Sequence, residues 1–156
     1  MRSETRTWRA PGVALGASLM AATLLGTPVP ARAGDSLVLV ERLDNQTLTD
    51  MEPKGDSVGD NLTFSNHLYD RNGTTKVGRD NGLCVRTVAG SMWECFRTYM
   101  LAQGQITVEG PYYDGKDSTF AITGGTGIYL SAEGEVKMQA RNPERTEFTL
   151  TFNLVH

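Results

Sequence analysis

Four side chains near the middle of the chain could together bind a small molecule. Trp93, Cys95, Arg97 and Tyr99 are separated by single residues, so in a β-strand their side chains share one face. Aromatic bulk beside a cation is typical of a ligand cavity, and Arg97 or Arg86 could then bind a carboxylate or a phenolate. The same pattern also fits an outward face with a solvated Arg97, and parity alone does not choose between these two interpretations.

Other kinds of chemistry find little support in the sequence. The chain has two histidines, His67 and His156, and neither lies in a recognised metal-binding or catalytic motif. The glycine-rich run at 124–127 is not followed by Lys-Ser/Thr or by a helical pattern, so it lacks the context of a phosphate-binding loop. We interpret that run as a bend that ends a strand, and we expect neither a metal nor a cofactor.

The only two cysteines, Cys84 and Cys95, are predicted to form a disulfide. If a strand at 83–88 turns at Ala89-Gly90 into a strand that begins near Met92, the two cysteines stand opposite each other, close to disulfide reach. An oxidising compartment favours this pairing. Two free buried thiols remain the alternative, because a slip of one residue in the register would separate them.

The elements that must position these residues are short strands. Phe148, Leu150, Phe152 and Leu154 alternate with polar residues, which is the pattern of a strand with one buried face. Similar runs separated by Gly, Asn and Asp predict an all-β domain of eight strands, and this patterning fits either a sandwich or a barrel. A barrel of eight strands is filled by side chains or holds one small ligand. The predicted strands are 36–43, 58–68, 82–88, 92–102, 105–111, 118–124, 134–140 and 146–154.

The first 33 residues have the order of a secretory signal. Arg2, Arg6 and Arg9 precede an apolar stretch at 12–25, and Ala31-Arg32-Ala33 follows, which is typical of a cleaved signal peptide. We therefore expect a signal peptide at 1–33, a single domain at 34–156 and a secreted, extracellular protein. The apolar stretch is short for a membrane span, which needs roughly 20 residues, so we expect no membrane association after cleavage.

The charge balance argues against polyanionic partners. The chain has 15 Lys and Arg and 18 Asp and Glu. Residues 1–33 contain four of the arginines and one of the glutamates, so residues 34–156 have 11 basic and 17 acidic side chains, a net charge of −6. A domain of this charge has no electrostatic reason to bind nucleic acid or an anionic membrane surface.

Four ordered stretches cover most of residues 57 to 140. They are Phe64-Ser65-Asn66-His67-Leu68-Tyr69-Asp70, Val77-Gly78 with Gly82-Leu83-Cys84-Val85, Ile106-Thr107-Val108-Glu109-Gly110-Pro111-Tyr112, and 121–129 leading to Val136-Lys137-Met138-Gln139. Together they resemble allene oxide cyclases, and Val77-Gly78-Arg79 is similar to a pattern of the related dirigent proteins. The resemblance implies an eight-stranded antiparallel β-barrel of the calycin-like type, with an apolar cavity for a small hydrophobic or phenolic ligand. It also implies a homo-oligomer, either a trimer or a dimer.

The resemblance also implies catalytic residues. Asn66, Cys84 and Tyr112 fall on positions that match the family's polar set, and Glu41 could stand for its glutamate. Asn66 could instead satisfy backbone groups at a strand end, and Tyr112 could be a packing aromatic. The family's Ser-Pro pair is absent from residues 41–53, and a disulfide would remove the free thiol of Cys84. Phe64, at the start of the first matching stretch, is a further candidate for ligand binding.

Three functions follow as hypotheses. The first is a secreted barrel that binds a small hydrophobic molecule and cyclises or isomerises it, chiefly by holding an apolar chain in a bent conformation. The second is a dirigent-like protein without catalysis of its own, which guides the coupling of phenoxy radicals. The third is a non-enzymatic carrier or structural barrel, so the sequence does not decide whether the protein is an enzyme.

Overall fold

The computed structural model describes residues 36–155, so the expected signal segment at 1–33 and His156 lie outside the described residues. This part of the chain is almost entirely β-structure. Within it no helix is long and apolar enough to cross a membrane. The elements are β1 (Ser36–Arg42), β2 (Gln46–Thr49), β3 (Asn61–Tyr69), β4 (Lys76–Val88), β5 (Met92–Leu101), β6 (Gly104–Tyr113), β7 (Ser118–Gly125), the 3-10 turn η1 (Gly127–Tyr129), β8 (Glu133–Ala140) and β9 (Glu147–Val155).

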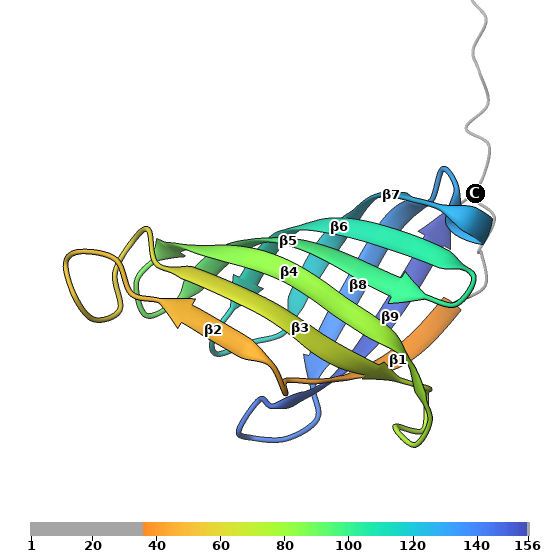
Figure 1. Cartoon of the computed structure of the whole chain (residues 1–156), viewed down its shortest axis with the longest axis horizontal. Coiled ribbons are helices and arrows are strands. Elements are labelled where there is room, and N and C mark those ends of the chain that lie inside the picture. Colours follow the sequence, from red (N-terminus) through yellow and green to blue (C-terminus); the bar gives the residue numbers. More distant parts are fainter. Residues whose placement is uncertain (1–35, 156) are drawn as a thin grey trace, which may run out of the picture. The chain divides into compact units, whose positions relative to one another are not determined.

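The strands form a closed antiparallel barrel (Figure 1). Hydrogen-bonded neighbours follow one another from β3 to β9, β9 pairs with β1, and β1 pairs with β3 to complete the ring. The short strand β2 lies outside this ring of eight and pairs only with β3. The structure thus confirms the eight-stranded antiparallel barrel and adds one short strand, β2, that the sequence pattern did not predict.

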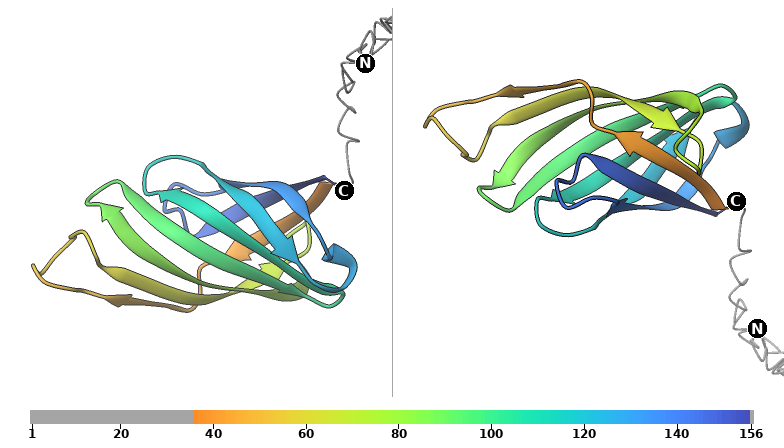
Figure 2. Two further views of the ribbon diagram at one scale, coloured as in Figure 1. Left: turned by 90° about the horizontal axis from the view of Figure 1, so that it is seen from above. Right: turned by 90° about the horizontal axis from the view of Figure 1, so that it is seen from below.

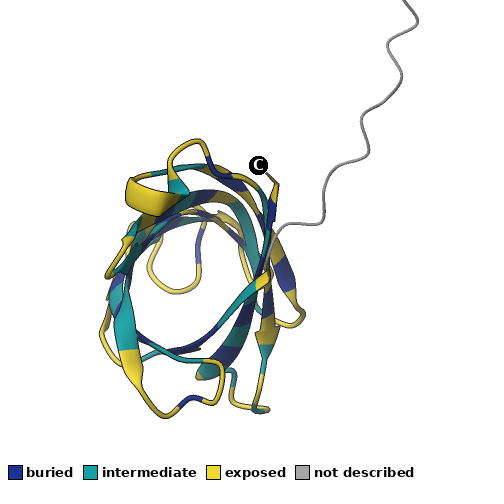
Figure 3. Ribbon diagram, turned by 90° about the vertical axis from the view of Figure 1, so that its right-hand side faces the viewer, coloured by how far each residue is buried: buried dark blue, intermediate teal, exposed yellow. Residues whose placement is uncertain are grey.

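Alternation along each strand fills the inside of the barrel. In β9, Phe148, Leu150, Phe152 and Leu154 are buried, while the residues between them are partly exposed. Viewed end-on, the strands surround one interior (Figure 3). The period-2 pattern therefore supplies a single core, because every second side chain of a barrel strand points inward.

Strand β4 begins at Lys76, whereas the sequence pattern predicted a strand from 82, because Asp80-Asn81-Gly82 was interpreted as a turn before it. Asp-Asn-Gly is typical of a turn, yet β4 is continuous from Lys76. Gly82 lies opposite Phe64 of β3, and a β-carbon on Gly82 would come within 2.2 Å of the Phe64 ring. This glycine makes room for an aromatic side chain inside the barrel, and Asp80 consequently points inward as well.

One end of the barrel carries an extension made of β2 and the loop at 50–60. The loop projects beyond the barrel at the end away from the C-terminal strand end (Figure 2). The carboxylate of Asp60 accepts hydrogen bonds from the backbone N–H groups of Met51 and Ser57, at 2.8 and 2.9 Å. These bonds satisfy two backbone N–H groups of the loop, which must find partners outside the strand pairings.

Cys84 and Cys95 form the expected disulfide. They are directly opposite each other in the β4–β5 pair, their Cα atoms are 4.0 Å apart, and both are buried. The hairpin register therefore did not slip, and the interpretation of two free thiols is wrong.

We predict that loss of this disulfide lowers the free energy of unfolding by about 3 kcal/mol, because the cross-link restricts a short loop of the unfolded chain. The comparison is between wild type and the Cys84→Ala/Cys95→Ala double variant, in urea titrations with and without reductant. Reductant should weaken wild type and leave the double variant unchanged. Equal stability of all four samples would contradict the prediction.

Candidate functional site

A small cavity opens into the barrel interior near β2. Its volume is about 80 Å³, well below the roughly 300 Å³ at which sites for drug-sized ligands begin. Six of the residues singled out from the sequence lie in its wall: Phe64, Asn66, Cys84, Cys95, Arg97 and Tyr112. Their functional roles stay predictions, but the fold does bring them together. The other lining residues are Leu43, Gln46, Leu62 and Met138.

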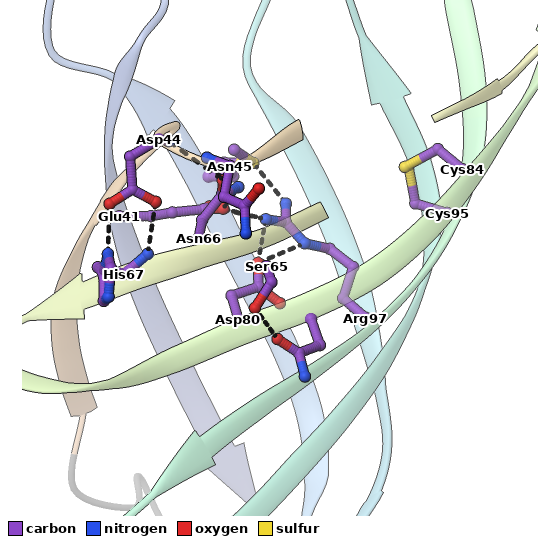
Figure 4. A network of polar contacts seen from close by, with 12 residues as sticks. Glu41, Asp44, Asn45, Ser65, Asn66, His67, Asp80, Cys84, Cys95 and Arg97 are labelled. Atoms are coloured by element: carbon purple, nitrogen blue, oxygen red, sulfur yellow. Dashed lines mark hydrogen bonds and ion pairs between the residues drawn. A yellow bond between two sulfur atoms is a disulfide. The ribbon is translucent and has the colours of Figure 1, made fainter. Parts of the chain in front are cut away.

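Arg97 lines this cavity and is held by two carboxylates (Figure 4). Its Nη2 atom is 2.7 Å from both carboxylate oxygens of Glu41, and its Nε atom donates to Asp80 Oδ2 at 2.9 Å. All three side chains are buried. Because Gly82 lies opposite Arg97 and Asp80 is two residues before Gly82, the β4–β5 register places Asp80 beside the guanidinium.

The charges of this cluster do not balance if every group is ionised, because two carboxylates face one guanidinium. Burial raises the pKa of Asp80 well above its ordinary value; Arg97 opposes this shift and Glu41 adds to it. Burial alone would lower the pKa of Arg97, but Asp80 and Glu41 raise it. Arg97 therefore stays protonated, and Asp80 keeps its proton to a higher pH than an exposed aspartic acid does.

The amide of Asn66 is oriented by groups on both of its sides. Its Nδ2 atom donates to Glu41 Oε1 at 2.7 Å, and its Oδ1 atom accepts the backbone N–H groups of Asp44 and Asn45 at 3.3 and 3.4 Å. Asn66 thus does satisfy backbone groups, as one interpretation held, and it also lines the cavity. One hydrogen of Nδ2 is left for a ligand, because the amide nitrogen has two.

Outside the barrel, a second set of contacts fixes the segment that follows β1. His67 Nδ1 contacts Asp44 Oδ2, and His67 Nε2 is 2.9 Å from Arg79 Nη1. A guanidinium can only donate, so Nε2 accepts from Arg79 and Nδ1 carries the proton that is donated to Asp44. This pairing holds Asp44, whose backbone N–H donates to Asn66. Contacts on the outer surface therefore help to fix a side chain of the cavity.

Tyr112 and the disulfide form part of the apolar wall. Tyr112 packs edge-on against Phe148 with ring centroids 6.2 Å apart, so it is also a packing aromatic, as the second interpretation held. Cys84 contributes a disulfide sulfur to the wall. Cys84 therefore has no free thiol with which to perform the catalytic role that the resemblance implies for a cysteine at this position.

Besides Glu41, which contacts Arg97 and Asn66, three of the sequence candidates lie outside the cavity wall. Trp93 and Arg86 lie together, with the guanidinium carbon 3.9 Å from the indole centroid, and Trp93 Nε1 donates to Asp114 at 3.0 Å. Arg86 also pairs with Asp114 and with Asp56, at 2.5 and 2.6 Å. Tyr99 is fully buried, with its ring centroid 4.9 Å from that of Phe152. These residues fasten the loop at 50–60 and fill the core.

Asp80 is the site residue that sequence reasoning missed. It lies within a tripeptide that is typical of turns, which concealed its place in a strand. One signal could have revealed it: Asp80 has the same parity as Cys84 and so points to the same side of β4. Met138, which places its Sδ atom 3.0 Å from Arg97 Nη1, had no such signal, because it looks like any core residue of an alternating strand.

We predict that Arg97→Met lowers the free energy of unfolding by about 3–5 kcal/mol at neutral pH, since it leaves two buried carboxyl groups without a counter-charge. The loss should become smaller as the pH falls and the carboxyl groups take up protons. Urea titrations at two pH values measure both effects. Arg42→Met, which removes an ion pair from the surface, is the control and should cost about 1 kcal/mol or less. Arg97→Met with the stability of wild type would refute the prediction.

We predict that Asp80→Asn raises the free energy of unfolding relative to wild type by an amount that increases with pH. The pKa of Asp80 is raised on folding, so above its ordinary value of 3.8 the unfolded chain releases a proton that the folded chain retains. Wild type therefore loses stability as the pH rises from 3.8 through the raised pKa, and the amide variant lacks this loss. The difference in unfolding free energy, variant minus wild type, should increase with pH in denaturant titrations. A difference that is constant or decreases would contradict this account.

Comparisons with known proteins agree with this architecture. The allene oxide cyclase family model matches residues 40–154. A pyocyanin demethylase structure is 27% identical, with a TM-score of 0.65, over 76% of this chain and 100% of its own. A pterocarpan synthase dirigent protein is 13% identical, with a TM-score of 0.61, over 80% of this chain and 96% of its own.

A third similar structure is an exo-specific intermolecular Diels-Alderase. It is 16% identical, with a TM-score of 0.57, over 76% of this chain and 98% of its own. At this identity, as for the dirigent protein, the likeness extends to the fold alone. The match of the family model covers nearly the whole barrel, from the middle of β1 to the end of β9. The chain therefore belongs to the allene oxide cyclase family.

Proposed function

We propose that this protein is a secreted barrel that binds a small hydrophobic molecule in the cavity above Arg97 and accelerates its cyclisation or isomerisation. The single observation that carries the proposal is the convergence of Asn66, Arg97 and Tyr112 on one largely apolar cavity. Membership of the allene oxide cyclase family supports a cyclase-type reaction. The disulfide supports export, because such bonds persist in oxidising compartments.

The chemistry that this cavity supports is confinement together with hydrogen-bond donation. Apolar walls restrict a flexible substrate to few conformations, which lowers the entropic part of the barrier. Arg97 and Asn66 present N–H groups that are oriented before the substrate arrives, by Glu41 and by backbone groups. Such donors stabilise negative charge that develops on a substrate oxygen. Glu41 is then a positioning residue, which acts through the two donors.

Self-association is part of the proposal. On the outer face, Leu83 and Phe96 are direct neighbours across β4 and β5, and they are 43% and 48% exposed. A paired apolar surface of this kind supports contact with a second copy of the chain, as a dimer or a trimer.

We predict that the purified protein changes the rate or the stereochemistry of ring closure of epoxide or polyene substrates relative to buffer, as chiral product analysis would show. Asn66→Ala should slow the reaction about 100-fold, since one oriented donor is lost. Thr63→Ala, an outward change on the same strand, is the matched control and should keep full activity. Product ratios equal to those in buffer for every substrate would exclude catalysis and leave binding alone.

A further inference from the structure

The polar atoms that Arg97 and Asn66 present to the cavity are hydrogen-bond donors. Arg97 Nη1 has only the Sδ atom of Met138 as a partner among the described residues, at 3.0 Å, and a thioether is a weak acceptor. Asn66 keeps one N–H hydrogen free, because its carbonyl oxygen and its other hydrogen are engaged. The carboxylates of Glu41 and Asp80 are fully buried and are absent from the cavity wall. Gln46 and Tyr112 also line the cavity, and each can donate or accept a hydrogen bond. The fixed requirement of the site therefore comes from Arg97 and Asn66, and a ligand meets it by supplying an acceptor oxygen.

The charge of the cluster sets a second condition on the ligand. Arg97 already has both carboxylates within hydrogen-bond distance, so its positive charge is fully compensated. An anionic group in the cavity would place a third acid beside a single guanidinium, in an interior where charges are weakly screened. A cationic group would face the outward N–H donors of Arg97. The group that enters the cavity must therefore be uncharged.

The size of the cavity sets a third condition. About 80 Å³ admits a small group such as an acetyl group, since a cavity that binds benzene has about 150 Å³, and it excludes most of a drug-sized molecule. The remainder of such a molecule would have to lie at the mouth, where β2 offers an apolar surface. Leu48 lies on the same side of β2 as Gln46, which lines the cavity, and it pairs with Leu62, which also does. Leu48 is 57% exposed and has no evident packing role.

From these three conditions we infer the class of ligand: an elongated, uncharged, apolar molecule whose acceptor oxygen, such as a ketone carbonyl, binds Arg97 and Asn66 while its tail lies on Leu48. This inference rests on the proposed function, because it assumes that the cavity is the binding site. It assigns β2 a role as the part of the mouth that binds the tail. A molecule with a distant charge still qualifies if that charge stays in solvent.

Three probes with the same body test the class. They are 4-hexylacetophenone, 4-hexylbenzoate and hexylbenzene, titrated calorimetrically into the full chain near neutral pH. We expect the ketone to bind about tenfold tighter than hexylbenzene, because its oxygen gains a hydrogen bond from a charged donor. The benzoate should bind more weakly than either. A benzoate that binds as tightly as the ketone, or a ketone no better than the hydrocarbon, overturns the class.

A pair of surface variants tests the role of β2. Leu48→Ser should weaken binding of the ketone several-fold, since it removes apolar contact area. Leu130→Ser makes the same change at an exposed residue, 73% exposed, next to η1 at the other end of the barrel (Figure 1), and should leave binding unchanged. Equal effects of the two variants overturn the role of β2.

The three probes also distinguish a failure of the proposed function from a failure of the inferred ligand class. Hexylbenzene reports on apolar binding without any acceptor, so its binding tests the cavity alone. If none of the three probes binds, the proposed function and the inference both fall. If the hydrocarbon binds and the ketone shows no preference, the cavity remains a binding site and only the class is wrong.

Discussion

The burial of Arg97 between Glu41 and Asp80 is the constraint on which the interior of this barrel depends. The three residues come from β5, β1 and β4, and Glu41 is 56 residues away from Arg97 in the sequence. A guanidinium inside a β-barrel is tolerated only when its charge is matched and its donors are satisfied. Closure of the ring by the β1–β3 pair supplies that match, because β1 carries Glu41 and β3 carries the Asn66 that binds it.

Such a cluster is a weak source of stability, because desolvation offsets much of the attraction between buried charges. Its effect is on specificity of arrangement: Asn66 has one orientation, Arg97 one rotamer, and both face the same cavity. The contacts of Asp44 with His67 and with Asn66 extend this order to the outer surface. An oriented polar cluster whose charges are balanced, beside largely apolar walls, is suited to recognising a neutral molecule.

The mouth of the cavity is organised differently. Arg86 is fixed by Asp56 and Asp114 and covers Trp93, so the loop at 50–60 is held by ion pairs that are partly exposed. β2 has strand pairing on one side and an exposed Leu48. The interior of the barrel is thus tightly determined, whereas its rim has few buried contacts, which is where a scaffold of this kind can vary its ligand.

The sequence by itself determined the elements that depend on local pattern. Alternation predicted all eight barrel strands, and the hairpin register predicted the disulfide, because both follow from the period of two along a strand. The resemblance singled out Asn66, Cys84 and Tyr112, which do meet in the cavity. Patterning alone left sandwich and barrel undecided, since closure is a relation between β1 and β3 that no local segment contains.

Only the tertiary structure decided which inward residues line the cavity and what charge they carry. Trp93, Arg97 and Tyr99 have the same parity, yet the position of each along the barrel places Arg97 in the cavity, Tyr99 in the core and Trp93 beneath Arg86. Asp80 belongs to a tripeptide that is typical of turns, but in the folded barrel Gly82 accommodates Phe64 and the tripeptide is part of a strand. The pKa of Asp80 depends on burial and on Glu41 from a distant strand, and such long-range terms have no signature in a one-dimensional pattern.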